Sequence, residues 1–269
     1  MQSLGIDIGS RTTKVIILRG TEGNSFPEIC FESIIGTGFD VSADIEHLLD
    51  CLHWDVAIST GYGRNRAAAI INSETISEIS AFALGGIFLY PHCRTILDIG
   101  GQDTKVIRYD DLGRILRFEM NDRCAAGTGK FMELSAMTLG MNLVCFSNLH
   151  KADSQPKDIN SMCAVFAESE MVSLIHSGAT PEEVGLGVIK SVASRAASML
   201  GKIGLTGPVA FAGGGSLNQT LSMMISSSLG VPVITSEKSQ FAGALGCALK
   251  GLGWSPAWGL SQTAHQTGS

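Results

Sequence analysis

One pattern of eleven residues occurs twice in the sequence. Residues 6–16 read IDIGSRTTKVI and residues 97–107 read LDIGGQDTKVI, so Asp-Ile-Gly and Thr-Lys-Val-Ile both recur 91 positions later. Each copy predicts a strand, a tight turn containing glycine and a second strand. Because the pattern occurs only twice, it does not indicate a solenoid. It predicts two related halves, each opening on a β-hairpin, that face each other across a cleft.

Strand-like and helix-like segments follow one another along the rest of the chain. We expect strands at residues 28–33, 55–60, 208–212 and 231–234, and helices at 41–52, 77–89, 124–137, 163–176, 180–203, from 218 onward and at 240–251. The best-defined helix start is Thr180-Pro181, with threonine as the N-cap and proline in the first turn.

The charge and hydropathy of the chain exclude several classes of protein. A net charge of −6 does not suggest a nucleic-acid partner held by electrostatics. No apolar run approaches the ~20 residues that a membrane span needs. The first residues lack the positive charge and apolar stretch of a signal or transit peptide. We therefore expect a cytoplasmic protein without a nucleic-acid or membrane partner.

The seven cysteines are an odd number and include no C-x-x-C pair. This count does not favour a disulfide framework, a zinc ribbon or a self-contained ferredoxin-type site. Five of the cysteines have apolar neighbours in the sequence, and we expect them to be packing residues: Cys30, Cys51, Cys93, Cys145 and Cys247.

The turn of the first repeat is rich in glycine and hydroxyl residues. Such a turn presents bare backbone N–H groups that can bind phosphate oxygens. Asp7, at the end of the first strand, is a candidate holder of Mg²⁺, directly or through water. The candidate phosphate-binding residues are Gly9, Ser10, Arg11, Thr12, Thr13 and Lys14.

The turn of the second repeat carries acceptors as well as donors. Asp98 is a second candidate for Mg²⁺, and Gly100 and Gly101 are candidates for binding phosphate. Gln102 is a candidate for orienting an attacking water, and Asp103 is a second candidate catalytic residue.

A third element, FAGGGSLN, joins a predicted strand to a predicted helix. Gly213, Gly214 and Gly215 let the backbone approach a nucleotide closely, and the helix N-terminus after Asn218 favours an anion. Gln240, at the start of the last helix, completes the candidate nucleotide-binding residues.

Together these three elements resemble the phosphate-1, phosphate-2 and adenosine motifs of the sugar-kinase, Hsp70 and actin superfold. The resemblance covers the chain from Gly5 to about Gly251. It implies an α/β fold with two RNase-H-like domains that bind ATP or ADP with Mg²⁺ in the cleft between them. We expect the first domain at residues 1–94, joined by the C-terminal helix 239–252, the second at 95–238, and a frayed tail at 253–269.

Cys124 and Cys163 differ from the other cysteines because each precedes a predicted helix after a polar lead-in. A thiolate there meets the positive end of the helix dipole and is a good ligand for an anionic cluster. Two ligands per chain do not complete a Cys₄ site, but a two-fold dimer supplies four. From spacing alone, two helix-capping cysteines without function remain the alternative.

The strings NDRCAAGTGKF and CAVFAESE around these cysteines resemble the activator ATPases of 2-hydroxyacyl-CoA dehydratases, a group related to the benzoyl-CoA reductase ATPase subunits. The resemblance implies that Cys124 and Cys163 of each subunit of a homodimer hold one [4Fe–4S] cluster. It also implies the cytoplasm of an anaerobe or facultative anaerobe, ATP hydrolysis coupled to electron transfer, and a ferredoxin or flavodoxin as electron donor. The partner would be a 2-hydroxyacyl-CoA dehydratase or a similar iron–sulfur reductase. The chain departs from the family at Ala81-Phe82, where Cys-His is common.

Two other classes of function stay open at this stage. The first is a small-molecule kinase of the same superfold, such as a relative of the N-acetylhexosamine kinases, which would not need Cys124 or Cys163. The second is a nucleotide-dependent interaction module like a chaperone or filament protein.

Overall fold

The computed structural model describes residues 1–20, 26–160 and 163–256. The predicted frayed tail at 253–269 lies outside the described residues from 257 on. The chain forms two compact units. Unit 1 consists of Met1–Ile96, Ile107–Arg117 and the C-terminal segment from Ser236, and unit 2 of Leu97–Val106 and Phe118–Thr235.

The first sheet has the strand order β3-β2-β1-β4-β5. The first hairpin is formed as predicted, because β1 and β2 pair antiparallel with Asp7 opposite Lys14 and Ile8 opposite Thr13. β3 pairs antiparallel with β2, whereas β4 is parallel to β1 and β5 is parallel to β4. The strands are β1 (Gln2–Ile8), β2 (Thr12–Arg19), β3 (Glu28–Gly36), β4 (Val56–Gly61) and β5 (Glu74–Thr75).

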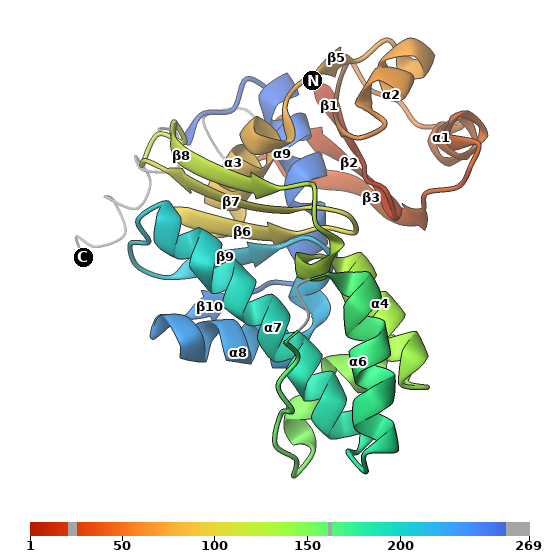
Figure 1. The fold of residues 1–269 in the computed structure, drawn as a ribbon. Helices are drawn as coiled ribbons and strands as arrows, with labels where there is room; N and C mark the ends of the chain where they lie inside the picture. Colours follow the sequence, from red (N-terminus) through yellow and green to blue (C-terminus); the bar gives the residue numbers. More distant parts are fainter. Residues whose placement is uncertain (21–25, 161–162, 257–269) are drawn as a thin grey trace. The chain divides into compact units, whose positions relative to one another are not determined.

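The described part of unit 1 contains the α-helices α1 (Val41–Leu49), α2 (Arg64–Ile71), α3 (Glu78–Leu89) and α9 (Ala242–Gly251). Helix α9 packs against both β1 and α3 (Figure 1). Helices α9 and α3 approach each other so closely that a side chain would not fit between them. A methyl group on Gly246 would lie 2.6 Å from the carbonyl carbon of Ala81, and one on Gly85 would lie 2.8 Å from that of Ala242. Glycine at these positions lets the two backbones touch.

The second sheet has the strand order β10-β9-β6-β7-β8. Read from β8, this order repeats that of the first sheet, so the duplication seen in the hairpins extends to all five strands. As β4 and β5 do, β9 and β10 pair in parallel. The strands are β6 (Thr95–Ile99), β7 (Thr104–Tyr109), β8 (Ile115–Asn121), β9 (Val209–Ala212) and β10 (Val233–Ile234).

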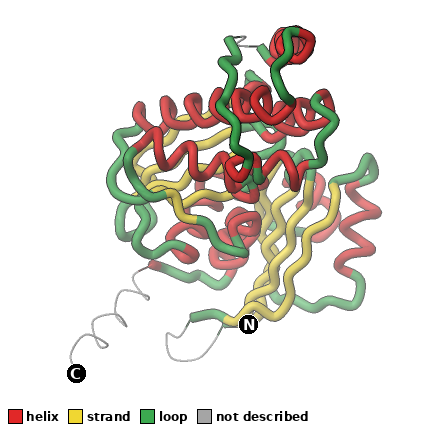
Figure 2. Tube along the Cα trace, turned by 90° about the horizontal axis from the view of Figure 1, so that it is seen from below, coloured by secondary structure: helices red, strands yellow, loops and turns green. Residues whose placement is uncertain are grey.

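The α-helices of unit 2 are α4 (Gly129–Thr138), α5 (Leu143–Ser147), α6 (Ala164–His176), α7 (Pro181–Lys202) and α8 (Gln219–Leu229). Figure 2 distinguishes the helices of the chain, in red, from its strands, in yellow. Their apolar faces surround one core that includes Phe131, Val188 and Phe211. Thr180 begins α7 as predicted, since its hydroxyl accepts from Glu183 N–H and the Glu183 carboxylate accepts from Thr180 N–H.

The segment after Cys124 differs from the prediction of a continuous helix. Cys124 precedes a short 3₁₀ turn, η1 (Ala125–Gly127), and α4 begins only at Gly129. Thr128 interrupts the helix because its backbone is extended, with φ −123° and ψ 169°. The sequence patterns also missed β8, α2 and α5.

The prediction that five cysteines are packing residues is correct for Cys93 and Cys247, which are buried. It is wrong for Cys30, Cys51 and Cys145, which are exposed. Apolar neighbours in sequence misled here because Cys30 lies on the edge strand β3 and Cys51 in the turn after α1.

Within the described residues, none of the helices combines the length and apolar character that crossing a bilayer requires.

We predict that Gly246→Ala lowers the free energy of unfolding by about 1–3 kcal/mol or more, because the added methyl group forces α9 away from Ala81. The matched control is Gly201→Ala in α7, where no atom lies within 4 Å of the added group. Because alanine favours a helix over glycine, the control is expected to gain up to about 1 kcal/mol. Urea unfolding of both variants tests this, and equal stability of the two would contradict the packing argument.

Candidate functional site

The first repeat places an aspartate and a lysine side by side at the end of β1. Lys14 Nζ lies 3.9 Å from Asp7 Oδ2, and both side chains are buried. A methyl group on Gly243, next to the start of α9, would lie 2.8 Å from Asp7 Oδ2. Glycine backbone therefore lies close to this carboxylate.

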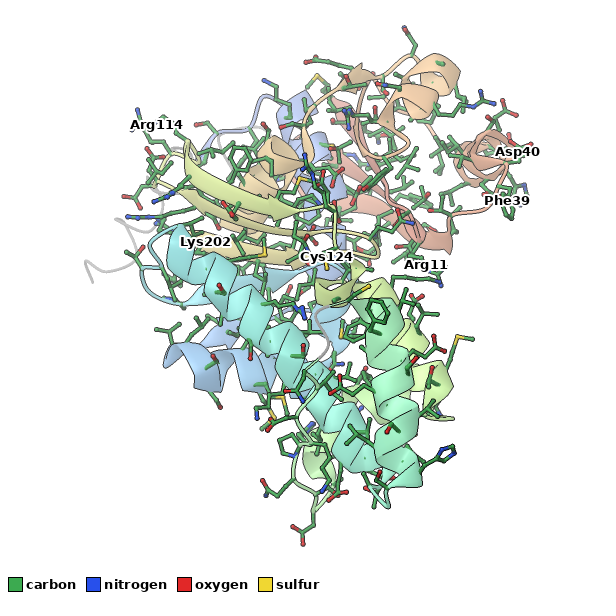
Figure 3. All side chains as sticks on the ribbon, viewed as in Figure 1. Arg11, Phe39, Asp40, Arg114, Cys124 and Lys202 are labelled. Atoms are coloured by element: carbon green, nitrogen blue, oxygen red, sulfur yellow. The ribbon has the colours of Figure 1, made fainter. Side chains whose placement is uncertain are left out.

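The turn after Asp7 is closed by a hydrogen bond from Gly9 N–H to the Thr12 carbonyl (3.1 Å). Thr37, directly after β3, holds this turn with two hydrogen bonds. Its N–H donates to the Arg11 carbonyl (3.0 Å) and its hydroxyl to the Gly9 carbonyl (2.9 Å). Arg11 itself is exposed at the turn (Figure 3). The predicted phosphate-binding residues of unit 1 thus lie next to one another, at a turn that the hydrogen bonds from Thr37 hold in place.

The second turn repeats this geometry, with Gly100 N–H donating to the Asp103 carbonyl (2.9 Å). Its lysine is more deeply buried than Lys14. Lys105 Nζ lies 3.1 Å from Asp98 Oδ2 and 2.6 Å from Asp103 Oδ2, and 1% of its side chain is exposed. The sequence prediction missed Lys105, although the Thr-Lys of the repeat signalled it. Gln102 lies exposed at the turn.

These three buried side chains carry one positive and two negative charges. Because an isolated net negative charge is costly in a protein interior, the group favours a cation next to it. Among the described residues no group of three or more His, Cys, Asp or Glu could hold a metal ion. Mg²⁺ often binds through one or two carboxylates together with waters and phosphate oxygens. Asp98, and Asp7 in unit 1, therefore fit such an ion.

The glycine loop after β9 meets the second hairpin from the neighbouring strand. Gly213 has φ +73°, and a methyl group there would lie 2.7 Å from the Ile99 carbonyl oxygen and collide with Asp98 Oδ1. A methyl group on Gly215 would lie 2.7 Å from Ile99 Cβ. The structure thus brings Gly213 and Gly215 together with Asp98.

A matching glycine loop in unit 1 was not predicted as part of the site. Gly61 has φ +89°, and a methyl group there would lie 2.8 Å from Asp7 Oδ1. A methyl group on Gly63 would lie 2.9 Å from Ile8 Cβ. Gly61 and Gly63 are the counterparts of Gly213 and Gly215, and the common spacing G-x-G after a buried strand was the signal in the sequence.

Two further predicted residues lie directly before helices α8 and α9. Asn218 is buried and caps α8, since its Oδ1 accepts from Leu221 N–H at 2.8 Å. Its Nδ2 also lies 3.8 Å from Met132 Sδ on α4. Gln240 lies half-buried in the 3₁₀ turn Ser239–Phe241 before α9.

Burial strongly affects one cysteine close to the first turn. Burial, and next the charge of Asp7, raise the pKa of Cys247 well above its ordinary value. Its thiol is therefore protonated at neutral pH, which agrees with a packing role.

Cys124 is exposed, and its backbone is held by the side chain of Asn121 at the end of β8. Asn121 Oδ1 accepts from Cys124 N–H (3.2 Å), and Asn121 Nδ2 donates to the Cys124 carbonyl (2.9 Å). These two hydrogen bonds fix the orientation of the Cys124 backbone. The sequence prediction missed Asn121.

Cys163 is exposed and is the N-cap residue of α6, as predicted. The chain before it is attached to the same helix, since Glu170 Oε1 accepts from Asn160 N–H (2.9 Å) and from Asn160 Nδ2 (3.2 Å). Cys124 and Cys163 both belong to unit 2. Two exposed thiols at turn-to-helix junctions fit half of a four-thiolate ligand set for an iron–sulfur cluster.

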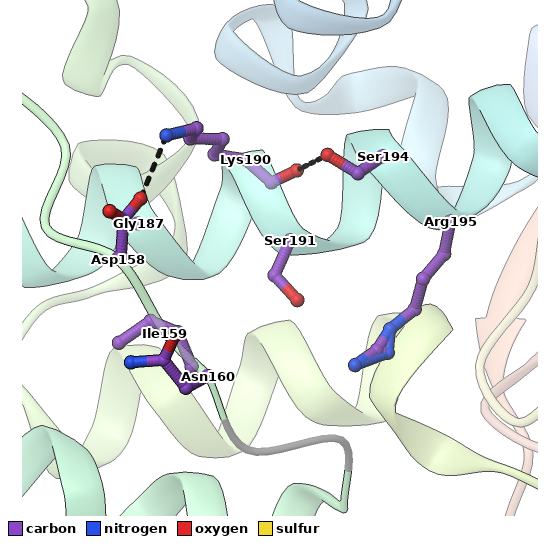
Figure 4. Close-up of a pocket in the computed structure, with 8 residues that line it drawn as sticks. All are labelled: Asp158, Ile159, Asn160, Gly187, Lys190, Ser191, Ser194 and Arg195. Atoms are coloured by element: carbon purple, nitrogen blue, oxygen red, sulfur yellow. Dashed lines mark hydrogen bonds and ion pairs between the residues drawn. The ribbon is translucent and has the colours of Figure 1, made fainter.

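A groove of about 410 Å³ lies between α7 and the segment before Cys163 (Figure 4). Asp158 Oδ1 and Lys190 Nζ form an ion pair across it at 2.9 Å. Arg195 reaches the same groove from α7, and its Cδ would lie 3.7 Å from a methyl group on Gly127. None of the residues predicted from sequence lines this groove.

Comparisons with known proteins identify the family of the chain. The model of the BadF/BadG/BcrA/BcrD ATPase family matches residues 4–251. The chain is 36% identical to the (R)-2-hydroxyglutaryl-CoA dehydratase activating ATPase of Acidaminococcus fermentans, covering 92% of this chain and 95% of that protein. It is 38% identical to the activator of lactoyl-CoA dehydratase of Anaerotignum propionicum, covering 93% of this chain and 96% of that protein.

A solved structure resembles the chain over nearly its whole length. It is the activator of the 2-hydroxyisocaproyl-CoA dehydratase from Clostridium difficile with bound ADPNP. The TM-score is 0.84 at 33% identity, and the match covers 98% of each chain. A more distant likeness to a ROK family glucokinase from Streptomyces griseus, at 11% identity and a TM-score of 0.58, shows the fold alone.

These matches confirm the α/β fold of the sugar-kinase, Hsp70 and actin type that the three glycine-rich motifs predicted. They also confirm the resemblance that rested on the strings around Cys124 and Cys163, and the prediction of an ATPase at the level of the family. The family model spans both repeated hairpins and both cysteines. The chain is a member of the BadF/BadG/BcrA/BcrD ATPase family.

Proposed function

We propose that the chain is an ATP-hydrolysing electron activator that works as a homodimer with one [4Fe–4S] cluster. Its partner would be a 2-hydroxyacyl-CoA dehydratase or a similar iron–sulfur reductase. The observation that carries the proposal is the pair of exposed cysteines, Cys124 and Cys163, in the unit that also contains the buried Asp98–Lys105–Asp103 group. Relatives named as dehydratase activators support the choice of partner.

The two hairpin turns would bind the phosphates of ATP and ADP. The N–H groups of the residues that follow Gly9 and Gly100 would donate to the phosphates, and Asp7 and Asp98 would hold Mg²⁺ directly or through water. When bound between these carboxylates and the nucleotide, Mg²⁺ would supply positive charge next to the phosphates. Gln102, exposed at its turn, would orient the attacking water, and Asp103 would stay paired with Lys105 and fix the shape of the turn.

Four cysteine ligands require two chains, because each chain contributes Cys124 and Cys163. The surface beside Cys163 supports such a contact, since Val165 and Phe166 are 70% and 69% exposed. Large exposed apolar side chains next to one another are typical of an interaction surface. When bound, the cluster would supply one-electron transfer at low potential, with a ferredoxin or flavodoxin as donor.

A sugar kinase of the same superfold is the less favoured alternative. The likeness to a glucokinase extends only to the fold, whereas the family match and the activator relatives cover nearly the whole chain. A kinase would also give no role to the exposed thiols of Cys124 and Cys163.

The direct test of the function is activation of a partner enzyme. Anaerobically purified protein, dithionite and MgATP should convert an inactive 2-hydroxyacyl-CoA dehydratase into its active form, and omission of ATP should prevent this. Hydrolysis of ATP without activation of any such dehydratase, together with phosphorylation of a sugar, would overturn the proposal.

We predict that Gly213→Ala weakens the binding of MgATP at least tenfold, or about 1.4 kcal/mol. The added methyl group would displace Asp98 and the backbone at Ile99. Gly207→Ala is the matched control, because Gly207 has nearly the same φ, +71° against +73°, but no atom within 4 Å. Isothermal titration with a non-hydrolysable ATP analogue measures both, and equal affinities would argue against a nucleotide site at this loop.

We predict that wild-type protein, purified without oxygen, contains about four irons per dimer and gives an electron paramagnetic resonance signal after reduction by dithionite. Cys124→Ser and Cys163→Ser should each lose most of the iron and the signal. Cys145→Ser is the control, since Cys145 is also exposed in unit 2 but lies on α5. Loss of iron in the control alone, or in none of the variants, would exclude the assigned ligands.

A further inference from the structure

The second phosphate turn and the start of α4 are joined by backbone hydrogen bonds. Gly129 N–H donates to the Gly100 carbonyl (2.8 Å), and Lys130 N–H donates to the Gly101 carbonyl (2.9 Å). The first N–H groups of a helix have no partner within the helix. Here the carbonyls of the turn supply partners for two of them.

A third, buried bond joins the same two segments. Thr104, the first residue of β7, donates its hydroxyl to the Gly127 carbonyl at 2.7 Å. The segments also touch directly, because a methyl group on Gly129 would lie 2.9 Å from the Gly100 carbonyl oxygen. Thr104 is 1% exposed. If its hydroxyl is removed, water cannot take its place as the donor to the Gly127 carbonyl.

The planarity of the peptide bond links this attachment to phosphate binding. In a trans peptide the C=O and N–H groups point in opposite directions. Because the carbonyls of Gly100 and Gly101 point at α4, the N–H groups of Gly101 and Gln102 point away from α4. A phosphate that accepts from these N–H groups polarises the same peptides and strengthens the bonds to α4.

Cys124 is only three residues from Gly127, and its backbone is held on the other side by Asn121. The short 3₁₀ turn Ala125–Gly127 therefore connects Cys124 to the residue that Thr104 binds. The first hairpin turn is held differently, by two hydrogen bonds from Thr37, directly after β3.

We propose that Thr104 is a positioning residue that ties the surroundings of Cys124 to the nucleotide state of the second phosphate turn. The proposal rests on the proposed function, because it concerns the cluster that Cys124 would help to hold. In this proposal Thr104 touches neither nucleotide nor cluster. It acts only through its hydrogen bond to Gly127, which holds β7 and the segment before α4 together.

The test measures how fast an iron chelator removes iron from the anaerobically purified protein without nucleotide, with MgADP, and with a non-hydrolysable ATP analogue and Mg²⁺. For the wild type we expect a several-fold difference in rate between nucleotide states. Thr104→Val, which keeps the shape but removes the hydroxyl, should bind both nucleotides and show the same rate in all states. Thr104→Ser should behave as the wild type.

Thr220→Val is the matched control, because Thr220 is also buried in unit 2 and donates its hydroxyl to a carbonyl, that of Ser147 (3.0 Å). It should keep the wild-type response. If Thr104→Val does not fold, Gly129→Ala replaces it, since its methyl group separates α4 from the Gly100 carbonyl and should also abolish the response.

Two results would overturn the inference while the proposed function stands: iron release from the wild type that ignores nucleotide, or a wild-type response in Thr104→Val. Wild-type protein without iron would instead remove the proposed function, and the inference with it.

Discussion

The buried ammonium group of Lys105 is the interaction on which the second half of the molecule depends. It lies within 3.1 Å of carboxylate oxygens of both Asp98 and Asp103, and all three side chains are nearly inaccessible to water. Removing one member of such a group would leave an uncompensated buried charge, which is strongly destabilising. The group therefore fixes the two strands of the hairpin and the turn between them, and it presents Asp98 beside the glycine loop at Gly213.

The two halves share one arrangement of strands and loops, but different contacts hold their hairpin turns. Each has a five-stranded sheet of the same order, an Asp at the end of its first strand and a G-x-G loop against it. In unit 1 the lysine is 3.9 Å from its aspartate, and the turn is fastened by Thr37. In unit 2 the ion pairs are shorter, and the turn is fastened to α4. Duplication thus provided two similar turns, and the second of them is hydrogen-bonded to the segment that follows Cys124.

Glycine has two distinct uses in this structure. At Gly61 and Gly213 the backbone has a positive φ and lies against an aspartate, so a side chain would be both strained and obstructed. At Gly85 and Gly246 the backbone is helical, and glycine serves only to bring α3 and α9 together. The first use concerns the site, whereas the second concerns stability.

The sequence by itself determined the fold class, the two hairpins and the identity of the candidate ligands. Local patterns were sufficient for these, because the repeat, the glycine spacing and the strings around Cys124 and Cys163 lie within short windows. Only the tertiary structure decided that Gly61 pairs with Asp7 as Gly213 does with Asp98, that Cys30, Cys51 and Cys145 are exposed, and that α4 begins after Cys124 rather than at it. These features arise from contacts between segments distant in the chain, such as the bond from Thr104 to Gly127, which no local pattern encodes.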